Sequence, residues 1–264
     1  MKRSLALFAG ALMGLTLLWG ASSCSGINLF SVQDDKDLGA QVDDEIKSSP
    51  SDYPLLDESD YPAAYAYLRD IRDEILDSGE VAHRDDFVWE VNIIHDDSVL
   101  NAFATPGGYL YFYTGLIKYL DSEDHFAGVM GHEITHAAER HSTEALTEVY
   151  GVDLLLSAAL GDDLGIVQDI ASGLSALAFS RDNEADADAH SVEYLAKTRY
   201  ACDGAAGFFE KLIAEGDAGS PPEFLSTHPN PDNRVEAIHD KAANLGCDTT
   251  PSGRDYQAFK DMLP

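Results

Sequence analysis

Two histidines one helical turn apart, with a glutamate beside the first, are the strongest chemical signal in the chain. They form the H-E-x-x-H pattern His132-Glu133-Ile134-Thr135-His136, in a segment predicted to be helical. Four residues advance a helix by about 400°, so both imidazoles project from nearly the same face. That arrangement suits two nitrogens on one zinc ion, with Glu133 beside the metal as general base. The pattern therefore predicts metal-assisted hydrolysis.

A catalytic zinc ion needs a third protein ligand and an open fourth position. Glu184 supplies a carboxylate in a strongly helical segment that follows His136. Asp188 lies four residues later on the same face, where it can accept a hydrogen bond from the outer N–H of a ligand histidine. A solvated acidic helix face is the alternative in so acidic a chain. The presence of H-E-x-x-H upstream favours the zinc site.

His228 precedes a proline in a loop rich in proline, serine and threonine, between Pro221 and Pro231. It could donate to the oxyanion of the tetrahedral intermediate, or act as a removable fourth zinc ligand that keeps the enzyme latent. We favour the second role, and a structural loop histidine is a further alternative. Arg234, on the following helix, is expected to pair with an acidic group near the site.

These segments resemble the HtpX and CAAX-prenyl-protease-like zinc peptidases, which are gluzincins of peptidase family M48. The similar segments are Val129–His136 with Arg140-His141, Ser180–Asp188, Ser226–Pro229 and Arg234. The resemblance extends from about Asp34 to Leu245. It implies one zinc ion per chain, bound by His132, His136 and Glu184, with Glu133 as the base.

A further resemblance concerns the substrate and the branch of the family. Asn101-Ala102-Phe103-Ala104, before a glycine pair, is similar to the family's substrate-edge strand. Such a strand aligns an extended peptide by backbone pairing, so loose sequence preference is expected. The chain looks like the exported lipoprotein branch, which includes LoiP and the catalytic domain of BepA. Unfolded or misassembled envelope polypeptides are the expected substrates.

The remaining elements must position these residues. Helical spacing covers Asp34–Lys47 and Ala63–Leu76, and strand patterns cover Phe87–His95, Asn101–Ala104 and Tyr109–Tyr113. From Leu116 onward the pattern is helical nearly throughout. One expected helix ends at Arg140. Five more are expected at Ala145–Leu160, Leu164–Phe179, Arg181–Lys197, Asp203–Ala214 and Pro231–Leu245, and a tail follows around Tyr256. We therefore expect one α+β metallopeptidase domain at 34–264, mostly helical and of zincin type, with a small early β-sheet.

Residues 1–24 have the pattern of a targeting segment. Lys2 and Arg3 are basic, Leu5 to Trp19 is apolar, and small residues precede Cys24. This resembles a bacterial lipobox, so we expect a signal peptide, a lipid anchor on Cys24 and a tether at 25–33. A cleaved soluble form and an uncleaved anchor are alternatives. All three place the catalytic part outside the cytoplasm, and we expect a periplasm-facing lipoprotein of the cell envelope, at the outer membrane.

The net charge limits the classes of binding partner, and the cysteines predict a disulfide. Seventeen Lys and Arg face 47 Asp and Glu, a formal net charge of −30 over 264 residues. Such a surface repels nucleic acid and anionic membranes. We interpret it as a solvation feature of a salt-rich habitat, and a specific cationic partner is the alternative. Cys202 and Cys247 are expected to form a disulfide in an oxidising compartment, and two free thiols are the alternative.

The expected function is zinc-dependent endopeptidase activity in protein quality control. One alternative is a chaperone-like binding module whose zinc site stays latent, with His228 in the open position. A purely structural zinc protein ranks last, because structural sites usually fill all four positions with Cys and His.

Overall fold

The computed structural model describes residues 30–215, 223–229, 233–251 and 253–264. The expected signal peptide, the lipidated Cys24 and most of the tether lie outside these residues. The elements are α1 (Val32–Ser48), α2 (Pro62–Leu76), β1 (Glu90–Ile94), β2 (Ala102–Thr105), β3 (Tyr109–Tyr113), α3 (Thr114–Tyr119), α4 (Glu123–Ala138), α5 (His141–Tyr150), α6 (Val152–Ala159), α7 (Leu164–Gly173), η1 (Leu174–Ala176), α8 (Arg181–Leu195), α9 (Ala206–Glu215), α10 (Glu223–Thr227), α11 (Arg234–Leu245) and α12 (Tyr256–Lys260). The predicted α+β class, mostly helical with a small early sheet, is confirmed.

The sheet has the strand order β1-β3-β2, with β1 parallel and β2 antiparallel to β3. The turn between β2 and β3 requires glycine, because Gly107 and Gly108 have φ angles of 77° and 91°. The first strand is shorter than the predicted Phe87–His95. It begins at Glu90, since Trp89 has a φ of 50°, which an extended strand cannot include.

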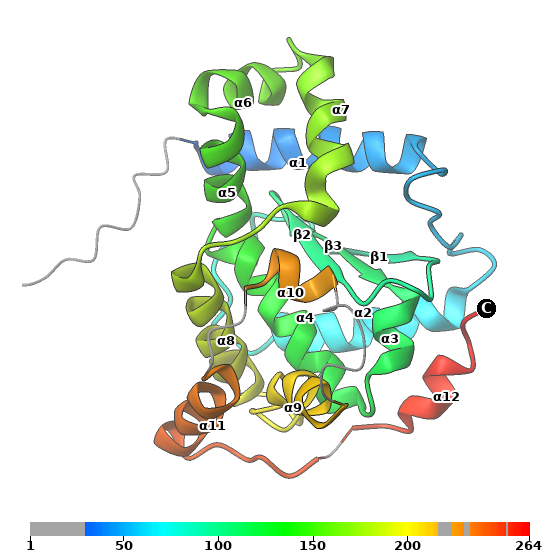
Figure 1. Ribbon diagram of the computed structural model, residues 1–264, viewed down its shortest axis with the longest axis vertical. Coiled ribbons are helices and arrows are strands. Elements are labelled where there is room, and N and C mark those ends of the chain that lie inside the picture. Colours follow the sequence, from blue (N-terminus) through cyan, green and yellow to red (C-terminus); the bar gives the residue numbers. More distant parts are fainter. Residues whose placement is uncertain (1–29, 216–222, 230–232, 252) are drawn as a thin grey trace, which may run out of the picture.

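Side chains of β3 alternate between two hydrophobic clusters on opposite faces of the sheet. Leu110 and Phe112 pack into the cluster that includes α2 and α4, whereas Tyr109, Tyr111 and Tyr113 pack against α1, α6 and α7. Figure 1 shows α1, α6 and α7 beyond one side of the sheet and α4 and α9 beyond the other. The sheet therefore separates the helix that carries H-E-x-x-H from the helical layer around α1.

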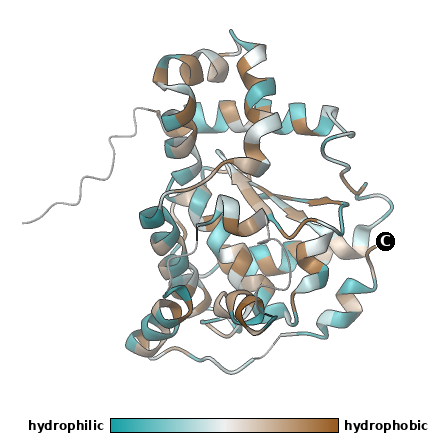
Figure 2. Ribbon diagram, in the orientation of Figure 1, coloured by the Kyte–Doolittle hydropathy of each residue, from teal (hydrophilic) through white to brown (hydrophobic). Residues whose placement is uncertain are grey.

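The helix α8 is polar along most of its length, and most of it is teal in Figure 2. It nevertheless packs closely on α4. Ser191 donates to the carbonyl of Gly128 at 2.8 Å, and a Cβ on Gly131 would meet Ser191 Oγ at 2.8 Å. Gly131 on α4 thus lets α8 approach closely, and this brings the carboxylates of α8 to the histidines of α4.

Three predicted helices end differently in the structure. The first, α4, begins after the N-cap Ser122 and ends at Ala138 rather than at Arg140, since Arg140 has a φ of 63°. The predicted helix Ala145–Leu160 is two helices, because Gly151 between them has a φ of 81°. The helix from Leu164 ends at Gly173, and the short 3-10 helix η1 and an irregular segment lead from there to Ser180. No helix in the described ranges is long and apolar enough to span a bilayer.

Candidate metal centre

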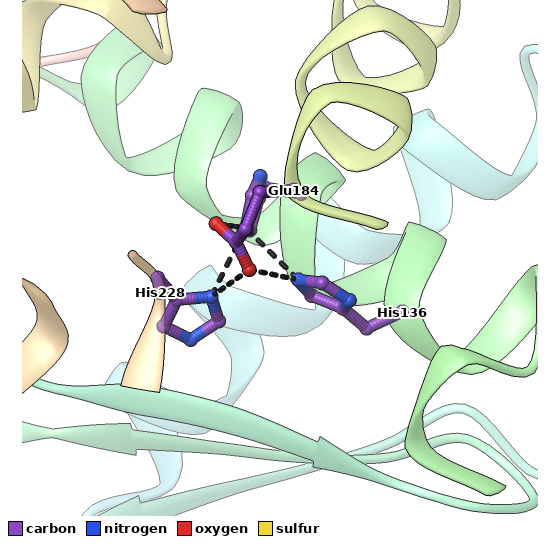
Figure 3. Close-up of side chains that lie close together, drawn as sticks. His136, Glu184 and His228 are labelled. Atoms are coloured by element: carbon purple, nitrogen blue, oxygen red, sulfur yellow. Dashed lines mark hydrogen bonds and ion pairs between the residues drawn. The ribbon is translucent and has the colours of Figure 1, made fainter. Parts of the chain in front are cut away.

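Four buried side chains from three segments converge on the side of the sheet where α4 packs. They are His132 and His136 of α4, Glu184 of α8, and His228 directly after α10. Each offers one ligand atom, and these atoms all lie within 4.8 Å of one another. Figure 3 shows the Glu184 carboxylate between the imidazoles of His136 and His228. The structure thus brings together the three expected zinc ligands and the expected switch histidine.

Helical geometry sets the distances among the three expected ligands. The Nε2 atoms of His132 and His136 are 3.0 Å apart, one turn from each other on α4. Glu184 Oε1 is 3.3 Å from His136 Nε2, and its Oε2 is 3.5 Å from His132 Nε2. Burial keeps the pKa of His136 well below its usual value, which favours the neutral ring that a metal binds. Two imidazoles and a carboxylate are a donor set that suits zinc.

His228 is more constrained than a loop residue, contrary to the sequence-based expectation. The short helix α10 precedes it, and the ring of Phe224 stacks on its imidazole with centroids 4.2 Å apart. Its Nδ1 is 2.9 Å from Glu184 Oε1 and 3.3 Å from His132 Nε2. Of the predicted loop, Pro221 and Pro231 lie outside the described residues. His228 is therefore placed as a fourth donor by a packed turn.

Glu133 lies next to His132 on α4, fully buried. Within the described chain neither carboxylate oxygen has a hydrogen-bond partner, and its Oε1 is 3.6 Å from His228 Nε2. Burial raises its pKa. A buried carboxylate without a hydrogen-bond partner is costly, so its presence calls for a functional reason. The unpaired oxygens fit a base that meets a reacting water beside a metal ion.

Asp188 and Arg234 support the site from behind His132. Asp188 Oδ1 is 2.9 Å from His132 Nδ1. Arg234 donates to Asp188 at 2.6 and 2.7 Å and to Glu184 at 2.8 Å. Burial would raise the pKa of Asp188, but the charge of Arg234 and the contact with His132 hold it below its usual range. The acidic partners that sequence alone could not name for Arg234 are thus Asp188 and Glu184.

The predicted edge strand lies at the edge of the sheet, since β2 pairs with β3 alone. By its register with β3, the N–H and C=O groups of Ala102 and Ala104 point away from β3. The side chains of Asn101, Ala102, Phe103 and Ala104 are nevertheless all buried. Asn101 donates to the carbonyl of Ser175, and Ser142 donates to that of Ala104. In this structure other segments therefore cover the edge.

Two aromatic rings that sequence reasoning did not single out cover the donor group. Phe179 stacks on His136 with centroids 3.7 Å apart, and Phe224 stacks on His228. The amide of Phe179 also donates to the carbonyl of Thr227, which joins the two covering segments. Neither phenylalanine carries a chemical signal in the sequence beyond its position next to a site motif.

The structure also contains the expected disulfide between Cys202 and Cys247. It joins the segment after α8 to the end of α11, the helix that carries Arg234. The pair therefore fastens the two helices that surround Asp188.

Comparisons with known proteins agree with this geometry. The family model for peptidase family M48 matches residues 62–242. The chain is 30% identical over 182 residues to the beta-barrel assembly-enhancing protease of Escherichia coli, covering 64% of this chain and 37% of that protein. It is 31% identical over 164 residues to the mitochondrial metalloendopeptidase OMA1 of Schizosaccharomyces pombe, covering 61% and 48%.

A third relative is the metalloprotease YcaL of Escherichia coli, 30% identical over 158 residues, which cover 57% of this chain and 61% of YcaL. The chain thus spans less than two thirds of the length of each of these relatives. The helix α1 lies before the range that the family model matches.

Proposed function

The chain belongs to peptidase family M48, and from this premise we propose that it is a zinc-dependent metalloendopeptidase. The observation that carries the proposal is the buried carboxylate of Glu133, which lacks a hydrogen-bond partner in the described chain and lies beside four converging metal donors. A structural site would have no use for such a group, whereas hydrolysis requires a base next to the metal.

His132, His136 and Glu184 would hold the zinc ion. When bound, zinc lowers the pKa of water and polarises the scissile carbonyl. Glu133 takes a proton from the attacking water and then delivers it to the leaving amine. Because burial raises the pKa of Glu133, its carboxylate is a stronger base toward the attacking water. Asp188 fixes the outer N–H of His132.

The substrate proposed is an extended, unfolded polypeptide that pairs with β2. The outward N–H and C=O groups of Ala102 and Ala104 support this assignment. Backbone pairing reads side chains weakly, so misassembled proteins of many sequences would be accepted. Three contacts have to open before such a peptide can reach β2: Ser175 with Asn101, Ser142 with Ala104, and Thr227, which precedes His228, with Asn101. We therefore assign His228 the role of a removable fourth ligand that holds the enzyme latent.

We also infer that the protein acts in the cell envelope as a periplasm-facing lipoprotein of the outer membrane, anchored through Cys24. The pattern of residues 2–24 supports export. One relative is named a beta-barrel assembly-enhancing protease, which fits misassembled envelope proteins as substrates. Labelling with radioactive palmitate tests the anchor, because Cys24→Ala should remove both the label and the membrane association.

A second candidate is a chaperone-like binding module with a latent zinc site. The burial of the whole donor group favours it, since His136, Glu184 and His228 are each 0% exposed and His132 is 2% exposed.

One experiment separates the two functions. Purified full-length protein is assayed for zinc content and for digestion of unfolded casein. The peptidase proposal expects one zinc per chain and digestion that Glu133→Gln abolishes, whereas a His132→Ala, His136→Ala double variant loses both zinc and digestion. Casein binding without digestion, in wild type and in His228→Ala alike, would favour the binding module. Stoichiometric zinc in the double variant would refute the ligand assignment.

A further inference from the structure

The two histidines of the metal centre have different partners on their outer sides. Both turn Nε2 toward the centre, where these atoms are 3.0 Å apart. On the outer side, His132 Nδ1 faces a carboxylate, Asp188, at 2.9 Å. His136 Nδ1 instead faces the Nδ1 of a third histidine, His141, at 3.2 Å. His141 is buried, 7% exposed, and is not one of the four converging donors.

A hydrogen bond between two ring nitrogens needs one donor and one acceptor. If His136 gives its Nε2 lone pair to a metal, its proton must be on Nδ1, which then donates. The Nδ1 of His141 has to accept, so the proton of a neutral His141 is on Nε2. That Nε2 is 3.4 Å from Oδ2 of Asp186, a carboxylate that can accept from it. The arrangement thus selects one tautomer for each ring.

A backbone turn explains why His141 lies against His136. Arg140 ends α4 in the left-handed conformation, with φ 63° and ψ 27°, and His141 is the first residue of α5. Arg140 donates to Asp35 of α1 and, at 2.7 Å, to the carbonyl of Phe30, while Thr143 donates to Asp35 at 2.8 Å. The unusual backbone is therefore held from α1, and it folds the start of α5 back onto the metal-binding helix.

The carboxylate that faces His141 comes from the helix that supplies Glu184. Asp186 lies two residues after Glu184 on α8, and its side chain is 44% exposed. His190, one turn further on, has its Nδ1 3.3 Å from the same Oδ2. Packing α8 onto α4 therefore delivers a metal ligand and, in the same step, the partner that orients His141.

We propose that His141, kept in one tautomer by Asp186, positions His136 by accepting a hydrogen bond from its Nδ1. The inference deepens the proposed function, because it presumes that His136 binds zinc. Outer hydrogen bonds fix the ring orientation of ligand histidines and tune their strength. A neutral imidazole is a weaker acceptor than a carboxylate. His136 therefore depends on orientation by His141, whereas His132 also gains basicity from Asp188.

The test is the zinc dissociation constant of the full-length protein, measured at constant pH by competition with a coloured chelator. His141→Leu removes the acceptor and should weaken zinc binding about 10–100-fold. His141→Asn places an amide oxygen near the position of Nδ1 and should restore most of the affinity. Asp186→Asn should give a smaller loss, because His141 keeps its ring but is no longer restricted to one tautomer.

His190→Leu is the matched control. His190 contacts the same carboxylate as His141, but its described partners are Asp186, Glu193 and Tyr194 rather than His136. Its zinc affinity should equal that of wild type. Thermal melts of the metal-free proteins identify any variant that fails to fold, and His141→Asn then carries the test.

Three results would overturn the proposal. They are wild-type affinity in His141→Leu, equal weakening in His141→Leu and His141→Asn, and the same loss in His190→Leu. Its failure is distinct from that of the proposed function. A wild-type protein that binds no zinc contradicts the peptidase assignment, whereas one that binds zinc and digests casein with unaltered affinity in His141→Leu contradicts this inference alone.

Discussion

Asp43 and Glu133 are both buried carboxylates, and they lie behind opposite faces of the sheet. Asp43, on α1, accepts hydrogen bonds from Tyr111 of β3 and from Lys47, each at 2.6 Å. Glu133, on α4, has no such partner in the described chain. A paired carboxylate contributes to the fold, whereas an unpaired one weakens it. The contrast indicates which face of the sheet is organised for stability and which for chemistry.

The largest expected effect is the loss of peptidase activity when the carboxylate of Glu133 is replaced. Glu133→Gln should keep zinc and lower kcat about 10²–10⁴-fold, because it removes the proton carrier and no ligand. Its unfolding free energy should not fall, since an unpaired buried charge is lost. Casein digestion and urea unfolding measure the two quantities. Near wild-type activity would place the base elsewhere, and a marked loss of stability would contradict the contrast with Asp43.

Replacing Arg234 tests whether the buried carboxylates of Glu184 and Asp188 need a paired cation for the protein to stay stable. Arg234→Met leaves Glu184 and Asp188 buried without their cation, and should lower the unfolding free energy of the metal-free protein by about 3–5 kcal/mol. Zinc should recover part of this loss, because the ion neutralises Glu184. Arg234→Lys is the control and should lose less, since it keeps the charge. A loss below about 1 kcal/mol in Arg234→Met would show that water reaches these carboxylates.

Asp43→Asn is the matched change on the opposite face. It weakens the hydrogen bonds from Tyr111 and Lys47 and should lower the unfolding free energy by about 1–3 kcal/mol. Zinc affinity and casein digestion by the folded protein should stay at wild-type values. A tenfold loss of activity in folded Asp43→Asn would mean that α1 acts on the metal centre, and the two faces would then not be independent.

Sequence patterns were sufficient where local periodicity determines structure. Apolar residues at helical spacing placed α1 and α2 within a residue or two, and alternation placed β3 at Tyr109–Tyr113. Sequence patterns did not predict the helix and strand boundaries that depend on a single backbone angle. The break at Gly151 is hidden because apolar residues continue on both sides of it. The late start of β1 depends on the positive φ of Trp89.

The candidate site divides in the same way. H-E-x-x-H, Glu184 and Asp188 could be predicted, because helical spacing places each pair on one face. The sequence left His141 open between a residue that supports a zinc ligand and an ordinary helix-end histidine, because its contact with His136 depends on the left-handed Arg140. The stacking of Phe179 on His136 also escaped prediction, because it joins segments far apart in the chain. The structure brings the predicted residues together, and their catalytic roles remain predictions.

The smallest expected effect is the change in peptidase rate when His228 is replaced. Its direction distinguishes a removable zinc ligand from an oxyanion donor. As a removable ligand, His228 blocks the position that water needs, so His228→Ala should raise the basal rate of casein digestion several-fold. As an oxyanion donor it would act only in the transition state, and its loss should lower kcat about 10²–10³-fold. The geometry supports the first role, because Nδ1 of His228 is 2.9 Å from Glu184 Oε1, among the other donors.

Phe224→Ala supplies the control for His228→Ala. The ring of Phe224 stacks on that of His228 and offers no ligand atom, so its removal loosens the switch histidine without deleting it. Under latency, both variants should be more active than wild type, with His228→Ala the higher. A fall in kcat for His228→Ala with no change in Phe224→Ala would assign the oxyanion role instead. Wild-type rates in both variants would mean that His228 only packs against its neighbours. Any restraint on peptidase activity would then have to come from the segment that carries Phe179.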